Sequence, residues 1–463
     1  MTTRPWDSDD LCDLRELRLR ALWSAFRREG LAFWLLCVYL MFEYVRPQSI
    51  FPALALFPWA TTTMMATAVA WLAGRPTARV STPANWFLLL YSVLLLLSSI
   101  GAYRPRESFS QFDGYFLWVV AYGLIILIVT TERRMLLMLL AFVLFNVKMT
   151  QFAFRNWMAI AFHFRASGTG GAPGWFANSG EFGIEMCMFL PIILYLTMGL
   201  RPHLSRWKFF ALLGIAGTAI VGIVASSSRG ALVGGAAVML FMLARSKRKA
   251  RALASVIVIG TLIFVAIPPE SKLRMSNSGA DLTSQLRLTY WTRGIEITND
   301  HPLLGIGYGN WAAYYGDHYD GPVQQAHNSV LQAASELGYP GLLSLLLLVG
   351  CSFALNARSR ALAIRAGPDG RLTYNLAIGL DGALIGFLVS GFFISALYYP
   401  FFWINLAMTV ALATVAKRLP VTSPARLSTR VGDQLRFGAA RGIAEENPES
   451  SQLFPVRQRR ART

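Results

Sequence analysis

Long apolar segments are the feature that most limits what this chain can fold into. About twelve runs approach the roughly 20 helical residues that a bilayer crossing requires. They begin near Leu31, Ile50, Ala84, Gly114, Met135, Glu181, Trp207, Arg229, Arg251, Tyr339, Asn375 and Phe401. The sequence therefore predicts an all-α, polytopic integral membrane protein with about 12 transmembrane helices.

The composition supports a membrane protein and argues against nucleic-acid binding. Of the 463 residues, 54% are hydrophobic and only 15% are charged, whereas a soluble domain carries about 25% charged residues. The net charge of +18 comes mainly from Lys and Arg in the terminal segments and in alternate turns between the apolar runs. We interpret this charge as a topology signal and expect no nucleic-acid partner.

The positive-inside rule predicts a multi-pass membrane protein with both termini in the cytoplasm. Residues 1–30 form a cytoplasmic segment, either an amphipathic helix on the membrane surface or a solvated, positively charged N-terminal segment. Residues 31–417 form the transmembrane domain, and residues 418–463 a basic, disordered tail. The two large external loops are 151–180 and 268–338.

The external loop 268–338 has about seventy residues, which is far more than a connector needs and indicates a functional element. Within it, residues 281–298 have a helical period, and this helix should stop before His301-Pro302. The glycines of 304–309 indicate a tight turn. Asp317, His318 and Asp320 make a poor metal site, and the external loops hold no Asp-x-Asp motif, so we expect no metal and no cofactor.

Arg229 follows three serines that can cap the helix that it starts. A cation is unfavourable at a positive helix N-terminus unless an anion also binds there. Free helix N–H groups and a guanidinium together suit a phosphate. The alternative is that Arg229 marks the membrane surface.

His327 lies two residues before Ser329, which with Gln332 fits a capping box. The short helix that starts there should end at Gly338. A protonated histidine is disfavoured at a helix N-terminus, so His327 should stay neutral and able to accept a proton.

Four other charged residues have two interpretations each. Glu181 lies at the start of an apolar helix. There it either caps the helix, because the dipole favours a carboxylate at the N-terminus, or orients substrate. Arg287 and Arg293 lie on the polar side of the helix 281–298, as solvated charges or as ligands of an anion. Asp381, inside an apolar run, is either functional or a partner of another helix.

The motifs, in order and spacing, resemble the O-antigen ligase and O-antigen polymerase superfamily of bacterial inner membranes. They are Ser226-Ser-Ser-Arg-Gly-Ala-Leu, Arg287-Leu-Thr-Tyr-Trp, His301-Pro-Leu-Leu-Gly-Ile-Gly-Tyr-Gly-Asn, His327-Asn-Ser-Val-Leu and Glu336-Leu-Gly-Tyr-Pro-Gly. The resemblance covers about residues 180–345. The stretch 42–48 is also similar to the start of the O-glycosylation ligases that accompany exosortase systems.

This resemblance implies a glycosyltransferase that moves a glycan from undecaprenyl diphosphate to an acceptor hydroxyl at the periplasmic face. The acceptor is lipid A-core, another glycan or a protein. Arg229 and Arg287 would bind the diphosphate, and His327 would activate the acceptor. Arg293, Ser228, Asn328 and Glu181 are candidate substrate-binding residues. A polymerase or a protein O-oligosaccharyltransferase of the same superfamily is the alternative, followed by a polysaccharide transporter.

Overall fold

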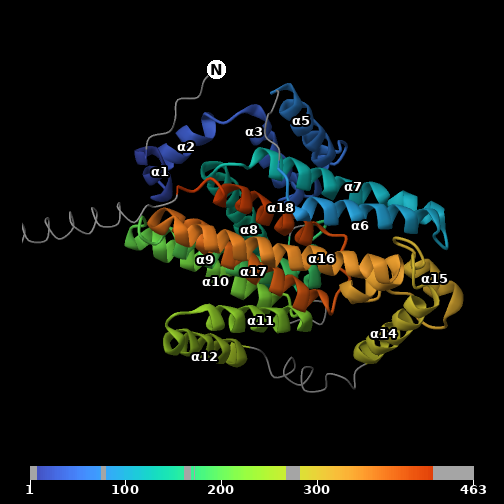
Figure 1. Ribbon diagram of the computed structural model, residues 1–463. Coiled ribbons are helices and arrows are strands. Elements are labelled where there is room, and N and C mark those ends of the chain that lie inside the picture. Colours follow the sequence, from blue (N-terminus) through green and yellow to red (C-terminus); the bar gives the residue numbers. More distant parts are fainter. Residues whose placement is uncertain (1–7, 75–79, 161–167, 172, 267–281, 421–463) are drawn as a thin grey trace, which may run out of the picture.

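A computed structural model describes residues 8–74, 80–160, 168–171, 173–266 and 282–420, which form helices joined by turns, without a strand (Figure 1). The helices are α1 (Ser8–Arg15), α2 (Leu19–Arg27), α3 (Leu31–Tyr44), α4 (Pro47–Ile50), η1 (Pro52–Leu54), α5 (Trp59–Ala73), α6 (Pro83–Ile100), α7 (Pro105–Ile128), α8 (Glu132–Ala159), α9 (Ser179–Leu200), α10 (Arg206–Ala225), α11 (Arg229–Arg245), α12 (Lys249–Ala266), α14 (Leu282–Asp300), α15 (Trp311–His318), α16 (Ser329–Arg365), η2 (Gly367–Gly370), α17 (Arg371–Gly391) and α18 (Pro400–Ala416).

The fold class is confirmed, but the number of transmembrane helices is not. Eleven of the twelve predicted apolar runs begin on or next to one long helix, whereas the run from Ile50 is divided among α4, η1 and α5. By length and composition, seven described helices can cross a membrane, or eight if the bent pair Leu19–Arg27 and Leu31–Ile50 is one span. The difference arises partly because α3, α5, α11 and α18 have only 14, 15, 17 and 17 residues, fewer than the roughly 20 that a straight crossing takes.

Helices α9, α17 and α18 are the most deeply buried of the bundle, and α11 packs against α9 and α17. Small residues let α9 and α17 approach closely. A Cβ atom added at Gly386 of α17 would lie 2.8 Å from the Cys187 carbonyl oxygen of α9, and one at Gly382 would lie 2.8 Å from Pro191. This is the packing that small residues at four-residue spacing allow between membrane helices. As a result, the N-termini of α9 and α11 lie at the same end of the bundle as the C-terminus of α17.

Helix α16 breaks where the sequence predicts that its first part ends. Gly338 has φ 71° and ψ −176° inside the helix, followed by Pro340. The glycine turn after α14 packs against this break, since Ile306 N donates to Ser335 O at 2.9 Å and Gly307 N donates to Glu336 O at 3.1 Å. The external helices α14 and α15 are thereby fixed to the end of α16 (Figure 1).

The predicted helix over 281–298 and the tight turn that follows are both confirmed. Helix α14 ends at Asp300, just before Pro302, and buries Tyr290 and Ile297. Its structure is described from Leu282, so residues 267–281 of the predicted loop lie outside the described part. Gly305, Gly307 and Gly309 all have positive φ, as a tight glycine turn requires.

Asp381 pairs with another helix. Its carboxylate accepts a hydrogen bond from Asn356 Nδ2 at 2.8 Å and forms an ion pair with Arg360, both on α16. The side chain is only 5% exposed. Of the two interpretations of this intramembrane acid, the structure favours helix-to-helix pairing.

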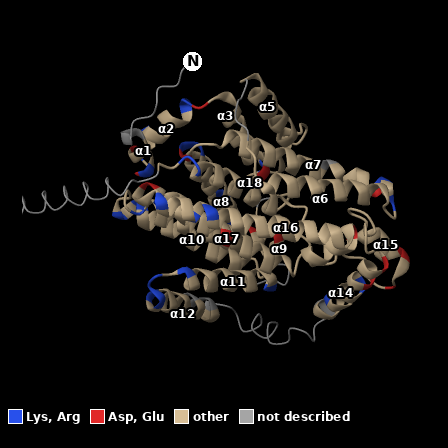
Figure 2. Cartoon of the chain, in the orientation of Figure 1, with Lys and Arg blue, Asp and Glu red and all other residues tan. Residues whose placement is uncertain are grey.

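Basic residues gather at the end of the bundle opposite to α14 and α15, at the left in Figure 2. There Glu29 forms ion pairs with Arg133 and Arg134, and Arg15 pairs with Glu132. The N-terminal segment is bound to this end by α1 and α2, which bury Leu14 and Ala25. The tail beyond Pro420 lies outside the described residues.

Candidate functional site

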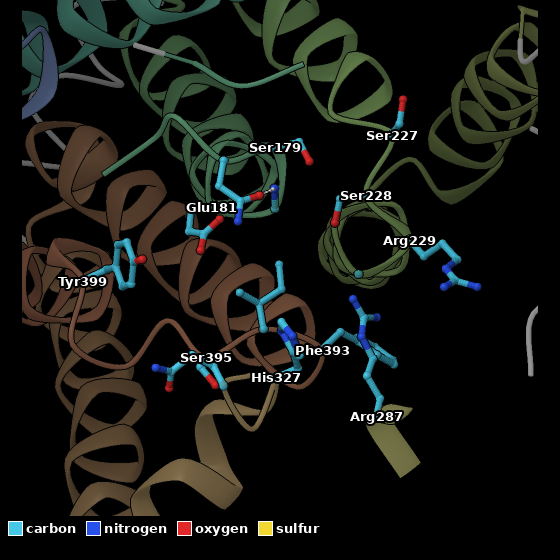
Figure 3. A pocket seen from close by; sticks show the side chains of 15 residues that line it. Ser179, Glu181, Ser227, Ser228, Arg229, Arg287, His327, Phe393, Ser395 and Tyr399 are labelled. Carbon is cyan, nitrogen blue, oxygen red and sulfur yellow. Dashed lines mark hydrogen bonds between the residues drawn. The ribbon is translucent and has the colours of Figure 1, made fainter. Parts of the chain in front are cut away.

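A pocket of about 530 Å³ lies at the end of the bundle where α9 and α11 begin, and five separate segments line it (Figure 3). Its volume is in the range of about 300–1,000 Å³ that ligand sites occupy. The lining residues are Asn178, Ser179, Gly180 and Glu181 at α9, Ser227, Ser228, Arg229 and Gly230 at α11, Arg287 on α14 with Gln325 and His327 ahead of α16, and Phe393, Ile394, Ser395 and Tyr399 between α17 and α18.

Two helix N-termini point into this pocket. Asn178 caps α9, its Oδ1 accepting from Gly180 N at 3.0 Å. Ser228 caps α11, its Oγ accepting from Ala231 N at 3.4 Å, which confirms the predicted serine cap. Each helix start adds a partial positive charge and N–H groups, so the wall between α9 and α11 favours an anion.

The two predicted arginines reach this wall from different elements. Arg229 is the first residue of α11, and Arg287 comes from α14, more than fifty residues further along the chain. In Figure 3 the Arg287 side chain extends toward the start of α11, while Arg229 projects to the side away from Glu181. The Arg287 guanidinium and two helix starts face the pocket, with Arg229 at its edge, and this arrangement attracts a polyanion such as a diphosphate.

His327 lies between Arg287 and the Glu181 side of the pocket (Figure 3). Burial and the nearby Arg287 guanidinium lower the pKa of His327 to about 4, so the imidazole is neutral at pH 7. The prediction of a neutral histidine is thus supported, but burial rather than the helix end is the first cause. Nε2 lies 3.3 Å from Gln324 Oε1; with the proton on Nε2, Nδ1 is the acceptor.

The backbone of the pocket is strained at two points. Among the described non-glycine residues, Leu17, Arg46, Ser227 and His327 have positive φ, and the last two line this pocket. Left-handed backbone at such residues costs about 1–3 kcal/mol and occurs preferentially at functional sites.

Glu181 and Tyr399 form the wall opposite to Arg287 (Figure 3). Burial and the neighbouring Glu181 carboxyl raise the pKa of Tyr399 to about 12, which keeps this hydroxyl protonated and able to donate. Glu181 is only 6% exposed and stands in the first turn of α9. The pocket therefore has a cationic side and an oxygen-rich side, with the imidazole between them.

Two of the predicted substrate-binding residues do not line the pocket. Arg293 pairs with Glu296 at 2.7 Å and lies over the Tyr319 ring at 4.8 Å. Asn328 turns its side chain to cap α16, with Oδ1 accepting from Val330 N at 2.9 Å and Leu331 N at 3.0 Å. Their roles in binding remain predictions.

The predicted capping box at Ser329 is wrong. Ser329 Oγ instead donates to Ile394 O at 2.7 Å and accepts from Ala396 N at 2.9 Å. The Ser329 hydroxyl thus attaches the α17–α18 turn to the start of α16. Asn328 is the N-cap residue of α16 instead.

That turn supplies the residues that the motifs missed, namely Phe393, Ser395 and Tyr399. The sequence signal was the Tyr398-Tyr399 pair before Pro400, which also fits an interface belt. Nothing in the sequence relates this turn to His327, because the turn is held near His327 by the hydrogen bonds of Ser329 with Ile394 and Ala396.

The described residues contain no group of three or more His, Cys, Asp or Glu side chains arranged to hold a metal. Asp317, one of the weak metal candidates, is paired with Arg104 and accepts from the Tyr103 hydroxyl at 2.9 Å. His318 stacks on Tyr314 with ring centroids 4.1 Å apart. These contacts account for both side chains structurally.

A family model described as O-antigen ligase matches residues 209–346. Residues 209–346 are thus similar to the O-antigen ligase family. The match confirms the resemblance and indicates a multi-pass membrane enzyme that processes glycans, with a lipid-linked glycan and an acceptor as its substrates in general. No curated protein sequence matches the chain.

The range that matches the family model contains Arg229, Arg287 and His327, so the cationic side of the pocket lies within it. Glu181 precedes this range and Tyr399 follows it. Both reach the pocket only because α9 and the α17–α18 turn pack against this range.

Proposed function

We propose that this chain is a glycosyltransferase of the inner membrane that moves a glycan from undecaprenyl diphosphate to an acceptor hydroxyl at the periplasmic face. The observation that carries the proposal is the meeting of two helix N-termini, two arginines and a neutral histidine in one pocket. We further propose that the reaction needs no metal, since the arginines can stabilise the leaving group themselves.

In the proposed reaction, the acceptor oxygen attacks the anomeric carbon of the lipid-linked sugar. The new C–O bond forms as the bond between this carbon and the diphosphate oxygen breaks, and the electron pair leaves with the diphosphate. Arg229, Arg287 and the N–H groups of α9 and α11 stabilise the developing negative charge. The hydroxyl proton goes to Nδ1 of His327, whose lowered pKa keeps it available as a base.

Glu181 and Tyr399 are suited to hold the acceptor. They lie on the side of His327 away from Arg287 (Figure 3), so an acceptor sugar there would have its hydroxyl close to the imidazole. The Tyr399 hydroxyl can donate a hydrogen bond and the Glu181 carboxyl can accept one, the pair of contacts that sugar hydroxyls use.

The proposed orientation puts the pocket outside and both termini inside, with residues 31–417 as the ligase domain. The concentration of Lys and Arg at the end opposite to the pocket supports it (Figure 2). Reporter fusions after Arg75, in the α10–α11 turn and after Arg418 test it. A cytoplasmic signal from the α10–α11 turn would overturn the whole proposal.

Activity is tested by transfer from purified undecaprenyl-diphosphate glycan to candidate acceptors. Arg229→Ala, Arg287→Ala and His327→Ala should each abolish transfer and leave lipid-linked glycan accumulated in cells, with the protein still inserted. Normal transfer by all three variants would refute the site assignment.

The acceptor separates the ligase from its alternatives. Glycan profiles of a deletion strain should lack glycan-capped lipid A-core if the protein is a ligase. Shorter chains on an unchanged capped core would indicate a polymerase, and loss of glycan from proteins would indicate an O-oligosaccharyltransferase.

A further inference from the structure

A second, larger cavity lies at the other end of α11. It has a volume of about 1210 Å³ and runs between α9, α10, α11, α12 and α17. Apolar side chains such as Leu190, Ile220 and Met242 line most of its length. Its volume exceeds the range of about 300–1,000 Å³ typical of sites for small polar ligands. Apolar walls of this extent suit a hydrocarbon chain.

Cations surround one end of this groove. Arg245 ends α11, Lys247 and Arg248 stand in the α11–α12 turn, and Arg371 begins α17. No Asp or Glu is among the lining residues. Ser246, Tyr374 and Asn375 add hydrogen-bonding groups at the same end. This basic rim is complementary to an anionic headgroup whose hydrocarbon chain continues into the groove.

We propose that this groove binds an anionic phospholipid, with the phosphate on the basic rim and one acyl chain between α10 and α12. Basic pockets between membrane helices on the cytoplasmic side are typical sites for such headgroups. The rim is at the end of the bundle where Lys and Arg gather, at the left in Figure 2, which the charge distribution assigns to the cytoplasm.

The position of the rim argues against the lipid-linked glycan as the occupant. Helix α11 has 17 residues, so its two ends are about 25 Å apart. Arg229 stands at one end and Arg245 at the other. A headgroup on the rim therefore belongs to a different lipid molecule, in the opposite leaflet from the proposed glycan donor.

The apolar part of the groove can be tested separately from its rim. A Cβ atom added at Gly217 of α10 meets nothing within 4 Å, and this residue lines the groove. A phenylalanine at position 217 starts from open space at the groove wall, and we expect its ring to occupy part of the space proposed for the acyl chain.

The experiment is native mass spectrometry of the purified full-length protein with dioleoyl phosphatidylglycerol or dioleoyl phosphatidylethanolamine. We expect the protein to retain phosphatidylglycerol preferentially. Lys247→Gln/Arg248→Gln should lower its affinity by about tenfold or more, since each cation near an anionic lipid contributes about 1 kcal/mol. Gly217→Phe should weaken retention with the rim intact.

The matched control is Arg358→Gln/Arg365→Gln, which removes the same charge from exposed residues on α16 outside the groove. It should retain phosphatidylglycerol like the parent protein. Equal retention of the two lipids, an equal loss in rim and control variants, or an unaffected Gly217→Phe would overturn the proposal. So would a polyprenyl phosphate as the retained lipid.

Discussion

The guanidinium of Arg287 lies close enough to His327 to disfavour its protonation, and together with burial it lowers the pKa of His327 to about 4. One residue proposed to bind the diphosphate thus also keeps the proposed base neutral. The two side chains come from α14 and from the loop before α16, so their contact depends on how α14 is attached to the bundle.

The first prediction concerns this coupling. Replacing Arg287 by Gln removes a cation that opposes protonation, so the pKa of His327 should rise from about 4 toward its ordinary value of about 6.5. It should stay below that value, because burial is the larger cause. Ring NMR signals of the protein's five histidines, assigned with His→Gln variants, measure the shift.

The sign of the pH dependence follows. In the parent protein the base is neutral above about pH 4, so the acidic limb of kcat/KM should lie near that pH. As the pH is lowered, any residual transfer by Arg287→Gln should be lost at a higher pH than transfer by the parent protein. Arg293→Gln on the same helix is the control and should leave the His327 titration unchanged. An unshifted His327 in Arg287→Gln would disprove the coupling.

The second prediction separates the two arginines of α14. Arg287 lines the pocket, whereas Arg293 pairs with Glu296 and lies over Tyr319. Arg293→Ala should therefore retain transfer within about threefold, since exposed ion pairs contribute little, while Arg287→Ala should lose it. Initial rates on purified lipid-linked glycan measure both. Equal losses would show that Arg293 also binds substrate.

The order of motifs predicted much of the cationic side of the pocket but none of its opposite wall. Arg229, Arg287 and His327 could be recognised because each stands near a helix start or a polar helix face. Tyr399 and Ser395 could not, because their place is set by hydrogen bonds from Ser329 to Ile394 and Ala396. Long-range contacts of this kind have no local signal in the sequence.

The same reason explains the error at the start of α16. Asn328 and Ser329 are both good N-cap residues, so local preference does not choose between them. The turn between α17 and α18 makes the choice, because it uses the Ser329 hydroxyl.

The third prediction tests that assignment. Asn328→Ala removes the acceptor of two backbone N–H groups and should destabilise the protein by about 0.5–2 kcal/mol. Asn328→Asp should restore the cap and, if Asn328 acts only through it, transfer as well. Thermal unfolding in detergent and the transfer assay measure the two effects. A stable Asn328→Asp variant without activity would instead indicate direct contact of the amide with substrate.

The fourth prediction concerns the break at Gly338. Its φ of 71° is unfavourable for alanine, and an added Cβ would lie 2.7 Å from the Pro302 carbonyl oxygen. Gly338→Ala should therefore cost at least about 1–2 kcal/mol and loosen the attachment of α14, which lowers transfer by displacing Arg287. Gly350→Ala in the same helix is the control, because an added Cβ there meets nothing within 4 Å.

Unfolding temperature alone does not distinguish a weakened break from a displaced α14, so the His327 titration serves as the second measurement. If α14 moves away in Gly338→Ala, the His327 pKa should rise, as we also expect when the Arg287 charge is removed. A destabilised variant with an unchanged His327 pKa would show that the break stabilises α16 without holding Arg287 in place. The glycine would then contribute to folding only, and the position of Arg287 would depend on the contacts of α14 and α15 themselves.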